Sequence, residues 1–159
     1  MILTNKRRQL TSESITKLPK IAQIIKEHEN EKIIIFTESK RTVEQLYKYL
    51  RQFGFKCGIV HSGIKRRHMV LEAWKRGIFN VLLTVRVLDE GIDVPQCSVG
   101  IIVSNSLTKR QLVQRIGRVV RPKPGKIAKI YIVISSGTFE ERIARKLKYL
   151  LTTSMYYYT

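Results

Sequence analysis

Three arginines stand three residues apart in the segment QLVQRIGRVVRP, residues 111–122. They are Arg115, Arg118 and Arg121, and Gly117 lies among them. Residues three apart are near neighbours on a helix, so Arg118 and Arg121 can point at one polyanion. An arginine aimed at a phosphoryl group during transfer stabilises the developing charge and is worth roughly 10³–10⁵ in rate. The alternative is a basic helix face that touches a nucleic-acid backbone, and this segment alone favours neither.

The charge of the whole chain favours a polyanionic partner. Its 159 residues include 30 lysines and arginines against 12 acids, a net charge of +18. Basic residues recur in clusters, for example in the run 65–67. Excess positive charge attracts nucleic acid and speeds its capture. A lysine-rich soluble surface would explain any single cluster, but the imbalance over the whole chain favours nucleic acid.

The length and composition are typical of one globular domain, with 43% hydrophobic and 26% charged residues. No apolar run approaches the ~20 residues of a membrane span, and the N-terminus has no signal-peptide pattern. Cys57 and Cys97 lie far apart without a CxxC motif, so we expect reduced thiols in a cytoplasmic protein. We divide the chain into an N-terminal segment (1–12), a domain (13–152) and a tail (153–159) that is either a frayed end or an apolar patch.

Hydrophobic patterns alternate between strand-like and helix-like segments along the chain. The predicted strands are 32–36, 58–60, 81–84, 99–103 and 130–134. The predicted helices have inner faces at Ile15, Leu18, Ala22 and Ile25; at Val43, Leu46 and Leu50 after a cap at Ser39; at Val70, Ala73 and Trp74; and at Phe139, Ile143, Leu147 and Leu150.

This alternation predicts an α/β fold: an open, mostly parallel sheet of five or more strands with helices on both faces. Ligands of such sheets gather outside the carboxyl ends of the strands. We therefore expect a site in the loops that follow Phe36, Val60, Thr84, Val103 and Ile134.

Two segments imitate nucleotide-binding motifs without meeting their chemical requirements. GIVHSGIK, residues 58–65, resembles a phosphate-binding P-loop but lacks the Gly-Lys-Ser/Thr ending, because Ile64 intervenes. Asp89 and Glu90 resemble a metal-holding pair, yet without a P-loop they have no nucleotide against which to hold a metal. We expect no metal site, and these residues provide at most half of a site for Mg²⁺-ATP.

Five segments together resemble the second RecA-like lobe of superfamily 2 helicases. TVRVLDEGIDVP (84–95) looks like motif V, QLVQRIGRVVRP like motif VI and KIIIFTES (32–39) like motif IV. VHSGIKRRHMVLEAWKRG and IYIVISSGTFEERIARKL are similar to the segments before motif V and at the end of that lobe. The resemblance covers about residues 13–152, with the motifs in order, and implies a RecA-like fold and an ATP-dependent helicase.

Within the superfamily, the motifs look most like those of DNA translocases of the XPB, UvsW and restriction-subunit type. DEAD-box RNA helicases usually carry His-Arg-Ile-Gly-Arg-x-Gly-Arg in motif VI. Here Gln114 replaces that histidine and Val120 replaces the glycine. The resemblance therefore implies DNA as the partner rather than RNA.

The resemblance also implies roles in nucleotide chemistry. Arg121 looks like the arginine finger, and Arg118 like its partner on the γ-phosphate. Gln114 looks like a residue that links the nucleotide to the neighbouring lobe. Gly91 would approach the phosphates through its backbone, and Asp93 resembles the residue near the ribose, although it could merely cap a turn. ATP and Mg²⁺ would be held mainly by an N-terminal lobe that these residues do not include.

A second implied set would grip one nucleic-acid strand, because hydroxyls and backbone N–H groups hold phosphates without reading sequence. The residues implied by the motifs are Thr37, Ser39, Ser62, Gly63 and Thr84. Four arginines could add positive charge along the same path: Arg41, Arg66, Arg67 and Arg86.

Other readings of single residues are structural. His61 is expected to be a satisfied histidine at a strand end, and His28 and His68 are expected at the surface. Trp74 and the phenylalanines are expected in the core, and Thr37, Ser39 and Ser62 could simply cap helices.

The function implied is that of the second lobe of a superfamily 2 DNA helicase or translocase, which supplies arginine fingers and backbone contacts. We expect no ATP hydrolysis by the isolated chain. The alternative is a stand-alone, non-catalytic module that binds nucleic acid or regulates a complete helicase.

Overall fold

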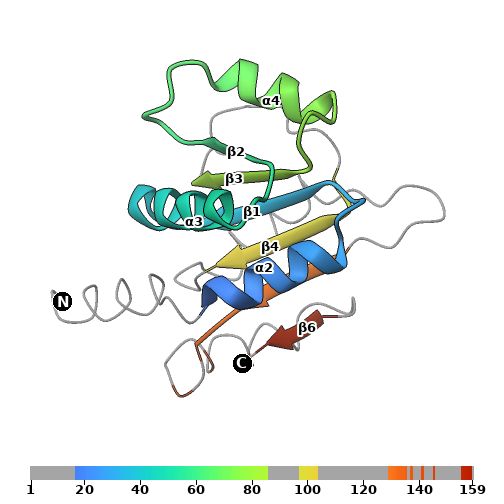
Figure 1. The fold of residues 1–159 in the computed structure, drawn as a ribbon. Helices are drawn as coiled ribbons and strands as arrows, with labels where there is room; N and C mark the ends of the chain where they lie inside the picture. Colours follow the sequence, from blue (N-terminus) through green and yellow to red (C-terminus); the bar gives the residue numbers. More distant parts are fainter. Residues whose placement is uncertain are drawn as a thin grey trace, which may run out of the picture.

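The computed structural model describes residues 17–85, 97–103 and 129–135, with Gly137, Glu141, Arg145 and the backbone of 155–158. The described elements are α2 (Lys17–Glu27), β1 (Ile33–Thr37), α3 (Lys40–Gln52), β2 (Cys57–Val60), α4 (Arg67–Lys75), β3 (Val81–Val85), β4 (Val99–Val103), β5 (Lys129–Val133) and β6 (Met155–Tyr158). Figure 1 shows their arrangement.

The strands form one six-stranded sheet in the order β2-β3-β1-β4-β5-β6, and every pair is parallel. This confirms the predicted open parallel sheet. β1 lies inside the sheet, with Phe36 opposite Thr84 of β3 and opposite Ile102 of β4. All five residues of β1 are buried, as its continuous apolar sequence predicts. Because the strands are parallel, their carboxyl ends lie along one edge of the sheet.

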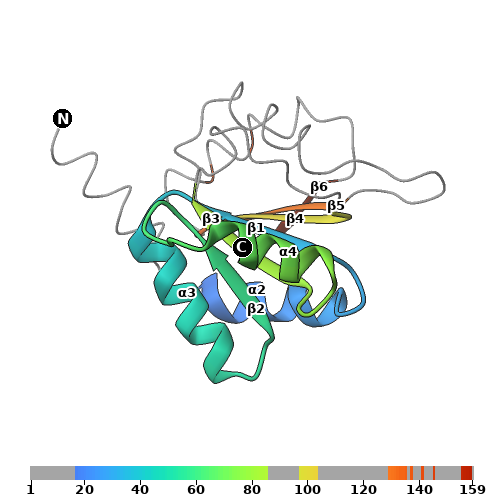
Figure 2. The ribbon, with the colours of Figure 1, turned by 90° about the horizontal axis from the view of Figure 1, so that it is seen from above.

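Helices cover both faces of the sheet, as predicted. Ile33 and Ile35 of β1 share a buried cluster with α2 and α3, and Figure 2 shows both helices on the same face of the sheet. α4 packs on the opposite face. A Cβ placed on Gly58 of β2 would lie 2.3 Å from the ring of Phe79 and 2.9 Å from Val70 of α4. Only glycine permits this close approach of helix and strand.

The local predictions hold best for α3. The Oγ atom of Ser39 accepts a hydrogen bond from the Thr42 N–H at 3.1 Å, which is an N-cap. Val43, Leu46 and Leu50 are buried, and the chain turns at Gly54 with φ of 81°. The cap and the inner face of this helix are therefore confirmed.

The buried faces of α2 and α4 differ in detail from the predicted ones. In α2 the buried apolar residues are Ile21, Ile24 and Ile25, whereas Leu18 and Ala22 are only partly buried; Ile15 lies outside the described residues. In α4 the buried residues are Leu71 and Trp74, with Val70 and Ala73 partly exposed. The burial of Trp74 in the core is confirmed.

The prediction that the phenylalanines lie in the core is wrong for Phe53. Its side chain is 64% exposed, because it follows the last turn of α3; its ring centroid lies 4.6 Å from that of Tyr49. Phe36 is buried as expected. Phe139 and most of the predicted closing helix lie outside the described residues.

The backbone of Met155–Tyr158, which we assigned to the tail, forms β6 and pairs in parallel with β5. The sheet therefore has one strand more than the five that hydrophobic patterns predict, within the "five or more" expected. Four consecutive residues, MYYY, carry little alternation, which is why periodicity did not reveal the strand.

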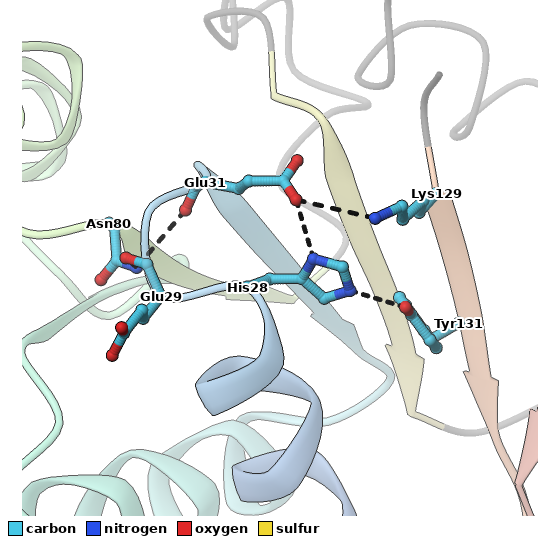
Figure 3. A network of polar contacts seen from close by, with 6 residues as sticks. All are labelled: His28, Glu29, Glu31, Asn80, Lys129 and Tyr131. Atoms are coloured by element: carbon cyan, nitrogen blue, oxygen red, sulfur yellow. Dashed lines mark hydrogen bonds and ion pairs between the residues drawn. The ribbon is translucent and has the colours of Figure 1, made fainter. Parts of the chain in front are cut away.

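The amino edge of the sheet holds a buried polar network around His28 (Figure 3). We expected His28 at the surface, but its side chain is buried, with 6% exposed. Its Nε2 atom lies 2.6 Å from the Tyr131 hydroxyl, and its Nδ1 atom lies 2.8 Å from the Glu31 carboxylate. The prediction failed because Tyr131 of β5 is 103 residues away in the chain. No local pattern could have supplied that partner.

Glu31 connects the network to further strands. Burial by itself raises the pKa of this carboxyl group, but hydrogen bonds with Ser98 and His28 and the charges of His28 and Lys129 outweigh it, so the pKa lies below its ordinary value. A lowered carboxyl pKa stabilises the fold above the ordinary carboxyl range, and that contribution is lost as the pH falls through the lowered pKa. Ser98 and Lys129 stand at the starts of β4 and β5.

Asn80 ties the same loop to β3. Its Nδ2 atom donates to the carbonyl groups of Glu29 and Glu31, at 2.7 and 3.3 Å (Figure 3 draws the network). Its own carbonyl accepts from Trp74 Nε1 and from the Ile33 N–H. The starts of β1, β3, β4 and β5 are thus connected by polar contacts, which fixes how their other ends are arranged.

We predict that Tyr131→Phe lowers the free energy of unfolding by about 1–3 kcal/mol, because it leaves the buried Nε2 of His28 without its partner. Urea unfolding followed by circular dichroism measures the change. Tyr47→Phe, which removes the same atom from a partly exposed tyrosine of α3, is the matched control. Equal effects of the two substitutions would contradict the role of the network.

Candidate nucleic-acid interface

The carboxyl ends of β1, β2 and β3 bring several predicted site residues together. Val60 and Phe36 both lie opposite Thr84 in the register of the sheet. The Thr37 Oγ1 atom donates to the Thr84 carbonyl at 3.4 Å, and both threonines are buried. Thr37 and Thr84 are therefore neighbours although they are 47 residues apart in the chain.

The first turn of α3 begins directly after β1 at this edge. Ser39 caps the helix, so its hydroxyl satisfies the Thr42 N–H, as the capping alternative predicted. The turn contains no acid, and its first residues are the exposed Lys40 and Arg41. The positive end of the helix dipole adds to these charges and favours an anion there.

The turn after β2 is held by His61. The Gly63 N–H donates to Nδ1 of His61 at 3.1 Å, and the Ile64 N–H donates to the His61 carbonyl at 2.9 Å. His61 is only 5% exposed, and its Nε2 atom lies 3.4 Å from Oε1 of Glu44 in α3. The prediction of a satisfied histidine at a strand end is confirmed. Ser62 and Gly63 are exposed.

The loops after β1 and β2 lie next to each other. A Cβ placed on Gly63 would be 4.0 Å from Nζ of Lys40. This neighbour was not in our predicted site. Its place at the first position of a capped helix, directly after a strand, was the sequence signal that could have identified it.

Basic side chains also mark the start of α4. Arg66 precedes the helix and is exposed, and Arg67 is its first, partly exposed residue. Together with Lys40, Arg41 and Lys65 they form a set of bases that we call the basic rim. The acids that follow β1 are Glu38 and Glu44, so positive charge predominates in the described part of this edge.

Thr84 has an unusual environment for a buried hydroxyl. Its Oγ1 atom has no hydrogen-bond partner among the described residues. Burying a hydroxyl without a partner costs roughly 1–3 kcal/mol. The Thr84 hydroxyl is thus a buried donor without a partner in the described part of the carboxyl edge, and a hydroxyl can donate to a phosphate oxygen.

The nucleotide half of the predicted site is not described by the structure. Gly91, Asp93, Gln114, Arg118 and Arg121 all lie outside the described residues, and so does Arg86 of the predicted nucleic-acid set. Their roles remain predictions. The arrangement that can be described is a set of hydroxyls, a capped helix start and the basic rim, all at one sheet edge. This arrangement suits a phosphate backbone.

Other chemistry is poorly supported within the described residues. They hold no group of three or more His, Cys, Asp or Glu side chains that could bind a metal ion. Burial raises the pKa of Cys57 to about 11 and that of Cys97 to about 12, so both thiols are neutral at pH 7 and poor nucleophiles. No helix in the described ranges is long and apolar enough to cross a membrane.

Comparisons with known proteins agree with this geometry. The family model "Helicase conserved C-terminal domain" matches residues 16–123. The DNA 3'-5' translocase XPB2 of Sulfurisphaera tokodaii is 32% identical over 133 residues, which are 84% of this chain and 29% of that protein. UvrABC system protein B of Lactobacillus johnsonii is 36% identical over 105 residues, which are 62% of this chain and 16% of that protein. The chain thus spans less than a third of either relative.

Solved structures share the fold. The C-terminal domain of the DEAD-box protein Dbp5 superposes with a TM-score of 0.72 at 25% identity, over 91% of this chain and 83% of that one. The helicase domain of Pyrococcus furiosus Hef gives 0.64 at 25% identity, over 83% of this chain and 28% of that one. These likenesses confirm the RecA-like fold and the resemblance to superfamily 2 helicase lobes.

We predict that Thr84→Val leaves the free energy of unfolding unchanged or raises it by up to about 1–3 kcal/mol, because the lost hydroxyl has no partner in the described structure. Thr37→Val is the matched control, since it removes a hydroxyl that donates to Thr84 and should lower stability. Urea unfolding compares the two. A larger loss for Thr84→Val than for Thr37→Val would show that the Thr84 hydroxyl is already satisfied.

Proposed function

Because the chain belongs to the helicase conserved C-terminal domain family, we propose that it works as the second RecA-like lobe of an ATP-dependent DNA helicase or translocase. In this role it grips one strand of nucleic acid and completes the site where another lobe holds ATP and Mg²⁺. The whole activity requires both lobes.

The observation that supports the nucleic-acid part is that hydroxyl groups, a helix start and basic side chains gather at the carboxyl ends of β1, β2 and β3. Thr37 contacts Thr84 there, and the turn at Ser62 lies beside the helix start at Lys40. Hydroxyls, helix N-termini and cations hold phosphates irrespective of base sequence, as a protein that moves along a strand requires.

The nucleotide part rests on family membership and on the order of residues in the chain. Gly91 and Asp93 follow β3 in the chain, and Gln114, Arg118 and Arg121 follow β4. The described carboxyl ends of β3 and β4 lie at the same edge of the parallel sheet. In our proposal Gly91, Asp93 and Gln114 contact the nucleotide from this lobe. Arg118 and Arg121 place positive charge where negative charge develops on the γ-phosphate.

DNA is the partner that we propose rather than RNA. The relative from Sulfurisphaera tokodaii, with 32% identity, is a DNA translocase by name. Gln114 and Val120 also depart from the motif VI of DEAD-box RNA helicases. The similarity to the Dbp5 domain supports the fold and does not distinguish DNA from RNA.

The nucleotide role predicts complementation. Mixing the full chain with the P-loop lobe of a homologous translocase should restore DNA-stimulated ATP hydrolysis, measured as phosphate release. Arg118→Ala or Arg121→Ala should reduce the restored rate by roughly 10³-fold or more, since each removes charge from the transition state. The chain alone should show no turnover.

Arg76→Ala is the matched control, because Arg76 is an exposed arginine at the C-terminal end of α4, away from the carboxyl edge. It should keep the restored rate. Restoration by both arginine variants would remove the finger assignment. DNA binding without any restored hydrolysis would favour the alternative, a non-catalytic nucleic-acid-binding module, which the basic rim also suits.

The nucleic-acid role predicts that the affinity for DNA falls with salt concentration and that the basic rim determines how steeply it falls. The double substitution Arg66→Ala/Arg67→Ala should weaken duplex binding and make the plot of log affinity against log salt shallower by up to about 1.8, since each phosphate contact contributes roughly 0.9. Fluorescence anisotropy measures both quantities. Lys26→Ala/Arg76→Ala changes the net charge equally at the ends of α2 and α4 that lie away from this edge. An equal change of slope would mean that only net charge matters.

A further inference from the structure

The turn after β2 has an internal constraint that the proposed strand contact does not explain. His61 is buried beneath the turn, while the next two residues, Ser62 and Gly63, are exposed. Nδ1 of His61 receives the Gly63 N–H at 3.1 Å. The backbone donor of Gly63 is therefore already used and cannot also bind a phosphate without breaking this bond.

This contact determines the tautomer of the neutral His61 ring. A backbone N–H can only donate, so Nδ1 must act as the acceptor. In the neutral ring the proton then lies on Nε2, which faces Oε1 of Glu44 at 3.4 Å. Glu44 belongs to α3, so the ring links the turn after β2 to the helix that begins at the basic rim. The exposed Glu44 adds orientation rather than much stability.

Steric constraints explain why a glycine stands at position 63. A Cβ placed there would lie 2.9 Å from Cε1 and 3.1 Å from Nδ1 of His61. A side chain at position 63 would force the turn or the buried ring to shift, because 2.9 Å is closer than a Cβ approaches another heavy atom. Glycine at position 63 thus allows the turn to pack on His61, and its backbone N–H binds the His61 ring.

Ser62 remains as the exposed donor of the turn. Ser62 lies between the buried His61 and Gly63 in the chain, and a Cβ placed on Gly63 would be 4.0 Å from Nζ of Lys40 at the start of α3. A hydroxyl next to cations forms a short hydrogen bond to a phosphate oxygen, and the ordered backbone lowers the entropy cost of making it.

We propose that His61 is a positioning residue: its Nδ1 atom occupies the Gly63 amide and thereby presents the Ser62 hydroxyl to a nucleic-acid phosphate. Ser62 and Gly63, which we predicted to bind phosphate together, then have different roles. Ser62 binds the phosphate, and Gly63 allows the turn. The inference rests on the nucleic-acid part of the proposed function.

A matched pair of substitutions tests the role of Nδ1. His61→Asn keeps an acceptor oxygen at the place of Nδ1, whereas His61→Gln moves the oxygen toward the place of Nε2 and leaves the Gly63 N–H without a partner. For a fluorescein-labelled duplex with a single-stranded extension, we expect His61→Asn to bind within about twofold of wild type. His61→Gln should bind about tenfold more weakly, the loss of one charge-assisted hydrogen bond.

Ser62→Ala keeps the test decisive if His61→Gln fails to fold, because Ser62 is exposed. It should also bind about tenfold more weakly than wild type. Equal affinity of wild type, His61→Asn and His61→Gln would overturn the inference, as would full affinity of Ser62→Ala.

A measurement without DNA separates this inference from the proposed function. In ¹⁵N-labelled full chain, a scalar coupling between the Gly63 amide nitrogen and Nδ1 of His61 should be visible by NMR and absent in His61→Gln. Absence of the coupling in wild type overturns the positioning role alone. A wild-type chain that shows the coupling but binds no DNA at low salt overturns the proposed strand contact, and the inference with it.

Discussion

The pairing of β1 with β3 on one side and β4 on the other is the constraint on which the described structure depends. β1 is buried along its whole length, so its backbone groups must find partners in neighbouring strands. Parallel pairing on both sides brings the carboxyl ends of all three strands to one edge. The contact between Thr37 and Thr84 follows from this register, and so does the place of the candidate interface.

The two edges of the sheet have opposite characters. At the amino edge, His28, Asn80 and Glu31 join loops and strand starts through hydrogen bonds. These polar side chains bind other groups of the protein. At the carboxyl edge, the buried Thr84 hydroxyl has no partner among the described residues, and Ser62 is exposed. The hydrogen bonds at the amino edge hold the strands in register. The carboxyl edge can therefore bind a ligand while the arrangement of the strands stays the same.

The chemistry of the carboxyl edge matches a partner recognised by its backbone. The basic rim supplies charge, α3 supplies a helix start, and the turn held by His61 carries the exposed Ser62. The net charge of +18 adds a long-range attraction that brings a polyanion to this edge before specific contacts form. These features fit the role proposed above, in which the lobe binds DNA without sequence preference and acts together with a nucleotide-binding lobe.

The sequence alone determined the class of the fold, the place of each predicted strand, the cap at Ser39 and the family, because apolar periodicity and motifs are properties of neighbouring residues. It also assigned roles to Arg118 and Arg121, which remain predictions. Only the tertiary structure decided that His28 is buried against Tyr131, that Phe53 is exposed and that Gly63 is needed for His61. Those outcomes depend on contacts across the fold and on exact spacing between atoms, and no one-dimensional pattern records either.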